Sequence, residues 1–486
     1  MQSLKEKYEL VIGLEVHIQL LTQSKAFAPE VNSYGDLPNT NVSVVTLAHP
    51  GVLPRANKTT FDYAIRLGLA LGSQIHRETI FARKNYFYPD LPKGYQITQD
   101  KTPICTGGEV IIQVKEENNR EKRIGITRMH LEEDAGKSIH IEGEEESFID
   151  LNRAGVPLIE MVSEPDIRTP EEAYWYLYEI RKLVRYLEIS DGNMEEGSLR
   201  CDVNVSVRKR GETKFGTRVE IKNINSFTNV KRAIEYEFER QTALVEAGEA
   251  FPQETRMFDA TTGKTYSLRT KETLNDYRYF PEPDLTPVVV DEAWIESVKA
   301  QMPALPRALY KKFTKEYALS DYDASQITDD KATALYYEDI CKHTQNKKAA
   351  ANWLLGAVRA YLNELTMEIS EFPLSPTQLA GLINLIDEGK INNNIGKQVF
   401  AKMLENPAKT ALQIAQEENL VVESNANELL GLIQNVLSKY PDKVLEYKNG
   451  KKGLQGLFVG EVMKATGGKA DPKLTNQLLM QELSKI

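Results

Sequence analysis

The sequence predicts an α+β fold, with an N-terminal, mainly antiparallel domain followed by two all-α domains. The 486 residues exceed what one hydrophobic core usually supports, so two or three domains are expected. Short segments of alternating apolar and polar residues dominate the first part of the chain. Apolar residues at helical spacing dominate from about residue 290 onward. We therefore place the domains at residues 1–296, 297–410 and 411–486.

Residues 14–20 show the two-residue period of a half-buried strand. The even-numbered positions are apolar and are predicted to face a core, whereas Glu15 and His17 lie on the opposite face. These two side chains project side by side and are candidate metal ligands. A lone histidine in a strand is more often a structural imidazole, and the sequence leaves both roles open.

Residues 199–208 alternate in the same way, and Arg200 and Asp202 belong to their polar face. An apolar stretch that reads VPLIEMV contains Glu160, whose carboxylate is costly to bury unless a cation or hydrogen bonds compensate. The acidic residues of the HLEEDAGK segment, residues 130–137, are further candidates for holding magnesium, which prefers carboxylate oxygens. Two alternatives stay open, an edge strand with Glu160 facing water and a polar turn at residues 130–137.

The helices carry clear start signals. Thr169 can cap a helix that begins with a proline, and Glu172 can close its capping box. Apolar residues recur at helical spacing in residues 353–362 and again in residues 429–437. The last helix is predicted to begin after Asp471 as its cap.

Composition excludes several classes of protein. With 41% hydrophobic and 27% charged residues, the chain is typical of globular proteins. It has no window of 18 uncharged apolar residues and no apolar N-terminal segment, so we expect a soluble cytoplasmic protein with no membrane partner. Cys105, Cys201 and Cys341 lie far apart, which argues against a disulfide framework and against a cysteine-based metal site.

The net charge of -10 disfavours a nucleic-acid partner unless basic residues are grouped. They are grouped near the C-terminus, where the candidate nucleic-acid contacts are Lys451, Lys452, Lys464 and Lys469. An ordinary solvated face is the alternative.

Two loops combine aromatic, charged and amide side chains around prolines: NYFYPDLPKGYQITQ at residues 85–99 and DYRYFPEPDL at residues 276–285. Proline keeps such segments extended and poorly pairing, and loops of this kind often carry function. An aromatic surface loop that covers a core edge is the alternative for either segment alone.

These loops and several further motifs resemble the B subunit of the bacterial glutamyl-tRNA(Gln)/aspartyl-tRNA(Asn) amidotransferases. The resemblance covers nearly the whole chain and is far more specific than any single motif. The further motifs are VIGLEVH (11–17), HLEEDAGK (130–137), VSEPDIR (162–168), MEEGSLRCDVNVSVR (194–208), VEIKNINSF (219–227), ANWLLGAVRAYLN (351–363) and GLFVGEVMKATGGKADPKLTNQLL (456–479).

The resemblance implies a cradle domain related to glutamine synthetase, then a helical domain, then a tail domain that engages tRNA. It also implies a ligase, in which ATP and Mg²⁺ serve to phosphorylate the side-chain carboxylate of glutamate or aspartate mischarged on tRNA. Ammonia from a separate glutaminase (the A subunit) then displaces the phosphate, and a small partner (the C subunit) completes a heterotrimer. Which of the two mischarged tRNAs is the substrate stays open.

The resemblance implies a set of site residues as well. Cations and a lysine suit phosphoryl transfer, in which the protein mainly positions groups and stabilises charge. We assign nucleotide contacts to Lys84, Arg200 and Asp202. The metal ligands, which are also catalytic, fall on Glu15, His17, Glu133 and Glu160, with Lys84 as a further catalytic residue.

One departure from the family concerns zinc. Many members carry paired cysteines at positions that are Ala28, Glu30, Ser43 and Thr46 in this chain. A structural zinc site needs four ligands, normally thiolate or imidazole. We therefore expect no zinc.

Two functions from other classes are alternatives. A self-contained ligase acting on a free amino acid would leave the helical residues after 296 without a purpose. A non-catalytic tRNA-binding scaffold would not need the clustered acids, because they repel phosphate. ATP-dependent amide formation on free glutamate would support the first. Loss of activity on mutating Glu160, with tRNA binding kept, would exclude the second.

Overall fold

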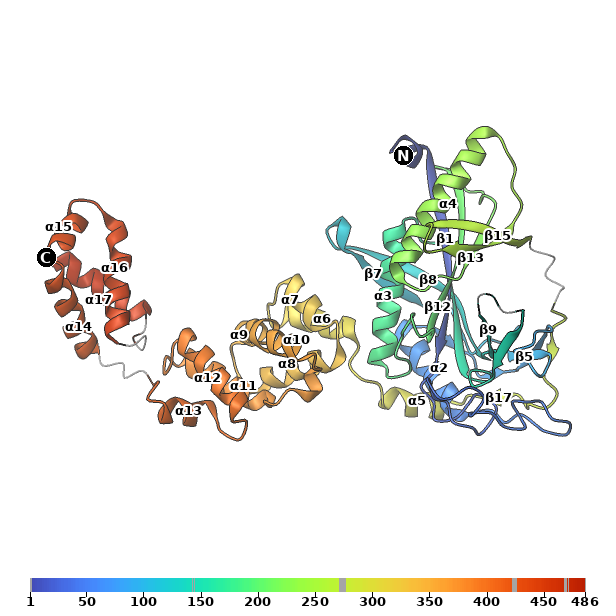
Figure 1. Ribbon diagram of the computed structural model, residues 1–486, viewed down its shortest axis with the longest axis horizontal. Coiled ribbons are helices and arrows are strands. Elements are labelled where there is room, and N and C mark those ends of the chain that lie inside the picture. The colour runs from blue at the N-terminus through green and yellow to red at the C-terminus, as the bar shows by residue number, and fades with distance from the viewer. Residues whose placement is uncertain are drawn as a thin grey trace. The chain divides into compact units, whose positions relative to one another are not determined.

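A computed structural model describes residues 2–141, 143, 145–270, 277–421, 426–466, 470 and 472–485. The chain divides into two compact units, residues 1–305 and residues 306–486 (Figure 1). The first unit is rich in strands and the second is helical, which confirms the predicted α+β class followed by helical parts. The finer limits, 1–296, 297–410 and 411–486, stay a prediction.

A ten-stranded sheet forms the centre of the first unit. Its main path is β15-β14-β13-β12-β1-β11-β8-β6-β2, with β7 paired to β8 off this path. Neighbouring strands are antiparallel except for β13 and β14, which are parallel, so the prediction of a mainly antiparallel sheet is confirmed. The strands are β1 (Tyr8–Gln19), β2 (Gln74–Ile75), β6 (Cys105–Thr106), β7 (Glu109–Val114), β8 (Arg120–Glu133), β11 (Pro157–Ser163), β12 (Leu199–Lys209), β13 (Val219–Lys222), β14 (Glu254–Asp259) and β15 (Lys264–Thr270).

Three small sheets complete the strands of this unit. β4 joins β5 and β16, β9 pairs with β10, and β3 pairs with β17. Their bounds are β3 (Glu78–Thr79), β4 (Ala82–Asn85), β5 (Tyr95–Thr98), β9 (Lys137–His140), β10 (Ser147–Asp150), β16 (Phe280–Pro281) and β17 (Val288–Val289).

The core of the first unit lies between the sheet and its helices. Leu14 and Val16 of β1 are buried in one cluster with Leu177 of α3 and Ile234 of α4. Helices α3 and α4 run beside the sheet in Figure 1, and they pack on each other. Glu15 and His17 lie on the other side of β1, as the alternation predicts. The helices of this unit are α1 (Gln2–Lys7), α2 (Lys58–Leu71), α3 (Pro170–Tyr186), α4 (Phe227–Ala247) and α5 (Glu292–Ala300), with a 3₁₀ turn at Lys115–Glu117.

One detail of the predicted helix starts is wrong. Thr169 caps α3 by accepting a hydrogen bond from the Glu172 amide at 3.1 Å, but Glu172 does not close a capping box. Its carboxylate accepts from the Arg168 amide at 2.7 Å and pairs with Arg120 and Lys122 of β8, both at 2.6 Å. The two cations of β8 therefore draw the carboxylate away from the capping residue.

The second unit contains helices throughout its described residues. Residues 353–362 form a helical run as predicted, although a π-helical turn at Leu354–Val358 joins α9 to α10. The predicted helix at 429–437 lies in α14, and α17 begins at Pro472 as expected, while Asp471 lies outside the described residues. The helices are α6 (Pro306–Lys315), α7 (Asp321–Ile327), α8 (Lys331–His343), α9 (Lys347–Trp353), α10 (Arg359–Leu365), α11 (Pro376–Asp387), α12 (Asn393–Glu405), α13 (Ala411–Glu417), α14 (Ala426–Lys439), α15 (Pro441–Lys448), α16 (Gln455–Ala465) and α17 (Pro472–Lys485), with 3₁₀ turns at Ile369–Glu371 and Lys452–Leu454.

Two predictions from composition can be compared with the structure. The three cysteines are free and buried, so the prediction of no disulfide framework is confirmed. Among the described residues, no helix has both the length and the apolar character that a membrane span requires.

Candidate active site

The polar face of the central sheet is organised around Glu160. Its strand, β11, lies between β1 and β8, and the register places Glu160 directly opposite His17 on one side and His130 on the other. β11 is therefore an interior strand, and the alternative of an edge strand with Glu160 facing water is wrong. The Glu160 residue is only 8% exposed, so its carboxylate needs partners.

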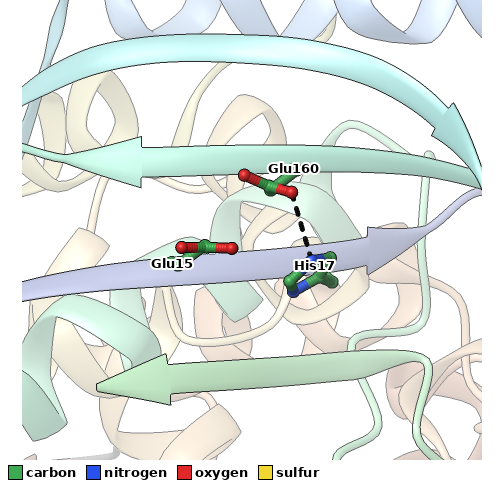
Figure 2. Close-up of side chains that lie close together, drawn as sticks. All are labelled: Glu15, His17 and Glu160. Atoms are coloured by element: carbon green, nitrogen blue, oxygen red, sulfur yellow. Dashed lines mark ion pairs between the residues drawn. The ribbon is translucent and has the colours of Figure 1, made fainter. Parts of the chain in front are cut away.

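Two groups of potential metal ligands share this carboxylate. One consists of Glu15, His17 and Glu160, and the other of His130, Glu132 and Glu160. Within each group, one candidate ligand atom per residue lies within 4.8 Å of the others. Figure 2 shows the first group, in which the imidazole of His17 approaches the carboxylate of Glu160 at 3.3 Å.

The second group is equally compact. His130 Nε2 lies 3.4 Å from Glu160 and 3.6 Å from Glu132. His17 Nε2 also lies 3.8 Å from Glu132, which links the two groups. Glu160 is thus within reach of a ligand set from each of its neighbouring strands.

Burial and charge shift the proton affinities of these residues in opposite directions. Burial would raise the pKa of Glu160, but the imidazoles of His130 and His17 hold it well below its usual range. Burial would lower the pKa of His130, but Glu160 and Glu132 raise it to about 9. Burial and the neighbouring Glu160 raise the pKa of Glu15 to about 7. A cation that binds here therefore competes with protons.

The residues present fit a hard divalent cation. Glu15, Glu132 and Glu160 supply carboxylate oxygens, which Mg²⁺ prefers, and the imidazoles can complete or orient the ligand set. His130 Nδ1 is buried and has no hydrogen-bond partner within the described residues, so this residue is not a fully bonded structural histidine.

Glu133, the predicted ligand from HLEEDAGK, lies outside both groups. Its carboxylate accepts a hydrogen bond from the Ile97 amide at 2.9 Å and forms an ion pair with Lys93. Glu132, its neighbour, belongs to the second group instead. The alternation of β8 was the missed signal, because residues 130 and 132 share the face that residues 131 and 133 do not. The alternative of a polar turn at 130–137 is wrong for residues 130–133, which belong to the strand.

Arg200 and Asp202 stand beside the first group on β12. The register pairs Arg200 with His17 and Asp202 with Glu15. Both side chains also have partners that the sequence did not reveal. Arg200 forms an ion pair with Asp134 at 2.9 Å, and Asp202 forms one with Lys222 of β13.

Lys84 approaches the acids from the small sheet of β4. Burial would lower its pKa, but the carboxylates of Glu132 and Glu160 raise it, so the ammonium stays charged at neutral pH. Its Nζ lies 4.9 Å from the ring centre of Tyr277 and 5.9 Å from that of Tyr86. The structure therefore brings Lys84 into the electrostatic surroundings of both ligand groups.

Three of the four positions at which the resemblance implies zinc ligands in other members, Glu30, Ser43 and Thr46, form a polar cluster here. Thr46 donates a hydrogen bond to Glu30. Burial would raise the pKa of this carboxyl, but the hydrogen bonds of Thr46 and Ser43 lower it. The buried Lys25 places its ammonium 3.6 Å from Glu30 and donates to Asn41 O at 2.7 Å. With neither thiolate nor imidazole at Ala28, Glu30, Ser43 or Thr46, these positions do not fit a structural zinc ion.

The predicted nucleic-acid residues lie in the second unit. Lys451 forms an ion pair with Glu446 at 3.0 Å, and the Nζ of Lys452 lies 4.2 Å from the ring centre of Tyr447. Lys464 is exposed near the end of α16, and Lys469 lies outside the described residues.

Comparisons with known proteins point to one family. Residues 10–296 match the model of the GatB/GatE catalytic domain, and residues 335–483 match that of the GatB domain. The chain is 50% identical to the B subunit of the aspartyl/glutamyl-tRNA(Asn/Gln) amidotransferase of Thermodesulfovibrio yellowstonii, over 99% of this chain and 100% of the relative. Proteins of the same name from Caldicellulosiruptor bescii and Staphylococcus carnosus are 49% and 48% identical, over 99% and 98% of this chain and 100% and 99% of the relatives.

Proposed function

The chain belongs to the GatB/GatE family, and on this premise we propose that it is the B subunit of an aspartyl/glutamyl-tRNA(Asn/Gln) amidotransferase. It is then part of a glutamine-dependent carbon–nitrogen ligase that acts on aminoacyl-tRNA. The reaction takes glutamate or aspartate attached to the wrong tRNA and converts its side-chain carboxylate to an amide.

The observation that carries this proposal is the position of Glu160. A buried carboxylate in the middle of a sheet, shared by two ligand groups, is costly unless cations or protons balance it. Phosphoryl transfer needs this kind of cluster, because cations neutralise the phosphates while the protein positions them. A protein that only bound tRNA would gain nothing from acids that repel phosphate.

The reaction has two steps. An oxygen of the substrate's side-chain carboxylate attacks the γ-phosphorus of ATP, and the bond from that phosphorus to the bridging oxygen of ADP breaks. Ammonia then attacks the acyl carbon, inorganic phosphate leaves with the electron pair of the broken C–O bond, and the nitrogen loses a proton to give the amide.

The residues of the polar face divide this work. Glu15, His17, Glu132 and Glu160 would hold Mg²⁺, which neutralises the phosphate oxygens. Lys84 adds an ammonium beside the same acids and stabilises negative charge on the transferred group. Arg200 and Asp202 lie next to His17 and Glu15 and would orient the nucleotide. Glu133, which pairs with Lys93, remains a predicted catalytic residue.

Ammonia needs a source, and a glutaminase subunit would supply it by hydrolysing glutamine. With a small third subunit, the active form is then a heterotrimer. The second unit would bind the tRNA body, where Lys451, Lys452, Lys464 and Lys469 would contact phosphates without reading bases.

The test uses the purified complex with ATP, Mg²⁺, glutamine and either Glu-tRNA(Gln) or Asp-tRNA(Asn). Wild-type complex is expected to amidate at least one of them. Glu160→Gln, which keeps the shape and removes the charge, should abolish amidation while glutamine hydrolysis continues. Wild-type amidation by Glu160→Gln at saturating Mg²⁺ would contradict the proposal. Amidation of free glutamate would support a self-contained ligase instead.

A further inference from the structure

Four tyrosines form a row beside Lys84 that the chemistry above does not use. The aromatic row consists of Tyr88, Tyr86, Tyr277 and Tyr279, in that order. Successive ring centres are 6.0, 6.1 and 6.1 Å apart, and each neighbouring pair meets edge to face. Its members come from the two proline-containing loops, which lie far apart in the sequence.

Backbone pairing holds the two halves of the row together. β4 pairs with β16, and the amide of Asn85 donates to Tyr277 O at 3.0 Å. The side chain of Asn85 donates to Arg278 O at 2.8 Å. Arg83 donates two hydrogen bonds of 2.8 Å to the carboxylate of Glu282. The row is therefore a built surface and not a chance meeting of two loops.

The middle of the row lies beside Lys84, and both of its ends are exposed to solvent. At its middle, Lys84 lies over Tyr86 and Tyr277, and its ammonium is held charged by Glu132 and Glu160. At its ends Tyr88 is 61% exposed and Tyr279 is 39% exposed. Core packing alone does not require rings that are this exposed.

We propose that the aromatic row stacks the unpaired 3′-terminal bases of the aminoacylated RNA. This inference rests on the proposed function. The reacting carboxylate is separated from the terminal ribose by a single amino acid, so the terminal base must lie near the ligand groups. The row occupies that neighbourhood, and aromatic side chains stack bases of any identity.

The ligand chemistry is a nucleobase, which ATP could also supply. Two features favour the RNA. A mononucleotide offers one base, whereas four rings in a row suit successive bases of a single strand. The exposed ends at Tyr88 and Tyr279 also admit a strand that enters from solvent. Tyr86 and Tyr277 contact Lys84 as well, so they are unsuitable for a clean test.

The experiment replaces the outer rings and reports stacking directly. The probe is a tRNA with 2-aminopurine at its 3′-terminal position, whose fluorescence falls when the base stacks. The variants are Tyr88→Leu with Tyr279→Leu, which remove both outer rings, and Tyr88→Phe with Tyr279→Phe, which keep them. Tyr34→Leu is the matched control, because Tyr34 is 72% exposed in another loop of the same unit.

In the full complex, binding should quench the probe in wild type, in the double Phe variant and in Tyr34→Leu. The double Leu variant should lose most of the quenching, and its apparent Michaelis constant for aminoacyl-tRNA should rise about tenfold, the size of one stacked base. Its Michaelis constant for ATP should not change.

Equal quenching in the double Leu variant would overturn the inference, and so would a rise confined to the Michaelis constant for ATP. Either result with an active wild-type complex leaves the proposed function standing. A wild-type complex that amidates neither mischarged tRNA would contradict the proposed function, and the inference with it.

Discussion

Two buried charge clusters in the first unit are built on opposite plans. In the loop cluster of Lys25, Glu30, Ser43 and Thr46, one carboxylate meets one ammonium and two hydroxyls, all supplied by the chain. In the sheet cluster, made up of Glu15, His17, His130, Glu132 and Glu160, three carboxylates crowd around two imidazoles. The charges of the loop cluster balance each other. The sheet cluster depends on protons or cations from outside.

The two clusters differ in whether they need a ligand. A cluster whose charges balance needs no ligand, and removing one of its partners destabilises the fold. A cluster left with excess negative charge has shifted pKa values in both directions, which is typical of reactive sites. We therefore expect the same residue types to serve stability in one place and chemistry in the other.

Removing one carboxylate of the sheet cluster from β8 should change the reaction most. Glu132→Gln removes a ligand of the second group, so amidation should fall by at least about a hundredfold and the Mg²⁺ concentration for half-maximal rate should rise. Glu133→Gln is the matched control, one residue away on the other face. It should leave the Mg²⁺ requirement unchanged, whatever its effect on rate. Equal Mg²⁺ requirements in the two variants would contradict the assignment.

The next prediction concerns the removal of the ammonium from the loop cluster. Lys25→Met leaves the Glu30 carboxylate buried without its ammonium, which should destabilise the first unit by about 3–5 kcal/mol. Thermal melting of the chain measures it. The double variant Lys25→Met/Glu30→Gln should recover part of the loss, since no uncompensated charge remains. A single variant that melts like wild type would show that the ion pair is not structural.

The exposed lysines of the second unit should affect tRNA binding and not the stability of the fold. Replacing Lys451, Lys452 and Lys464 together by Gln should weaken tRNA binding and reduce the slope of log affinity against log salt by about 2–3, because roughly 0.7–0.9 is lost for each phosphate contact. Filter binding over a salt series measures this slope. Melting temperature should hardly change. An unchanged slope would exclude these lysines from the tRNA contact.

The smallest expected change is in the pH dependence of stability, to which Glu15 and Glu30 contribute with opposite signs. Burial and Glu160 raise the pKa of Glu15 from 4.5 to about 7, so without cations this group lowers stability as pH rises from 4.5 to about 7. Burial would raise the pKa of Glu30, but hydrogen bonds from Thr46 and Ser43 lower it below 4.5, so this group's stabilisation is present above pH 4.5 and lost on further acidification.

Urea unfolding in the presence of a chelator separates the two. At pH 8, Glu15→Gln should be more stable than wild type and Glu30→Gln less stable. Acidification should shrink the first difference between about pH 7 and pH 4.5 and the second below pH 4.5. The same sign for both variants at pH 8 would contradict the contrast between the clusters.

The sequence predicts the parts of this contrast that depend on local patterns. Alternation along residues 14–20 places Glu15 and His17 on one face, and capping residues locate the start of α3. Strand order could not be predicted from local patterns, because pairing of β11 with β1 and β8 joins segments far apart in sequence. Local patterns therefore do not distinguish an edge strand from an interior strand at Glu160.

For the candidate site too, local alternation predicts which side chains share a face, but not their partners from distant strands. Applying alternation to HLEEDAGK would have selected His130 and Glu132 over Glu133. The partners Asp134 of Arg200 and Lys222 of Asp202 follow from long-range register and leave no local signal. The Lys25 ammonium beside Glu30 is likewise a tertiary contact.

We expect the sheet cluster, and not the loop cluster, to bind divalent cations. Binding of Mn²⁺, a spectroscopic probe for Mg²⁺, can be titrated by electron paramagnetic resonance in wild-type complex, Glu160→Gln and Glu30→Gln. We predict Mn²⁺ affinity at least about tenfold weaker in Glu160→Gln and unchanged in Glu30→Gln. Equal Mn²⁺ affinity in wild type and Glu160→Gln would contradict the claim.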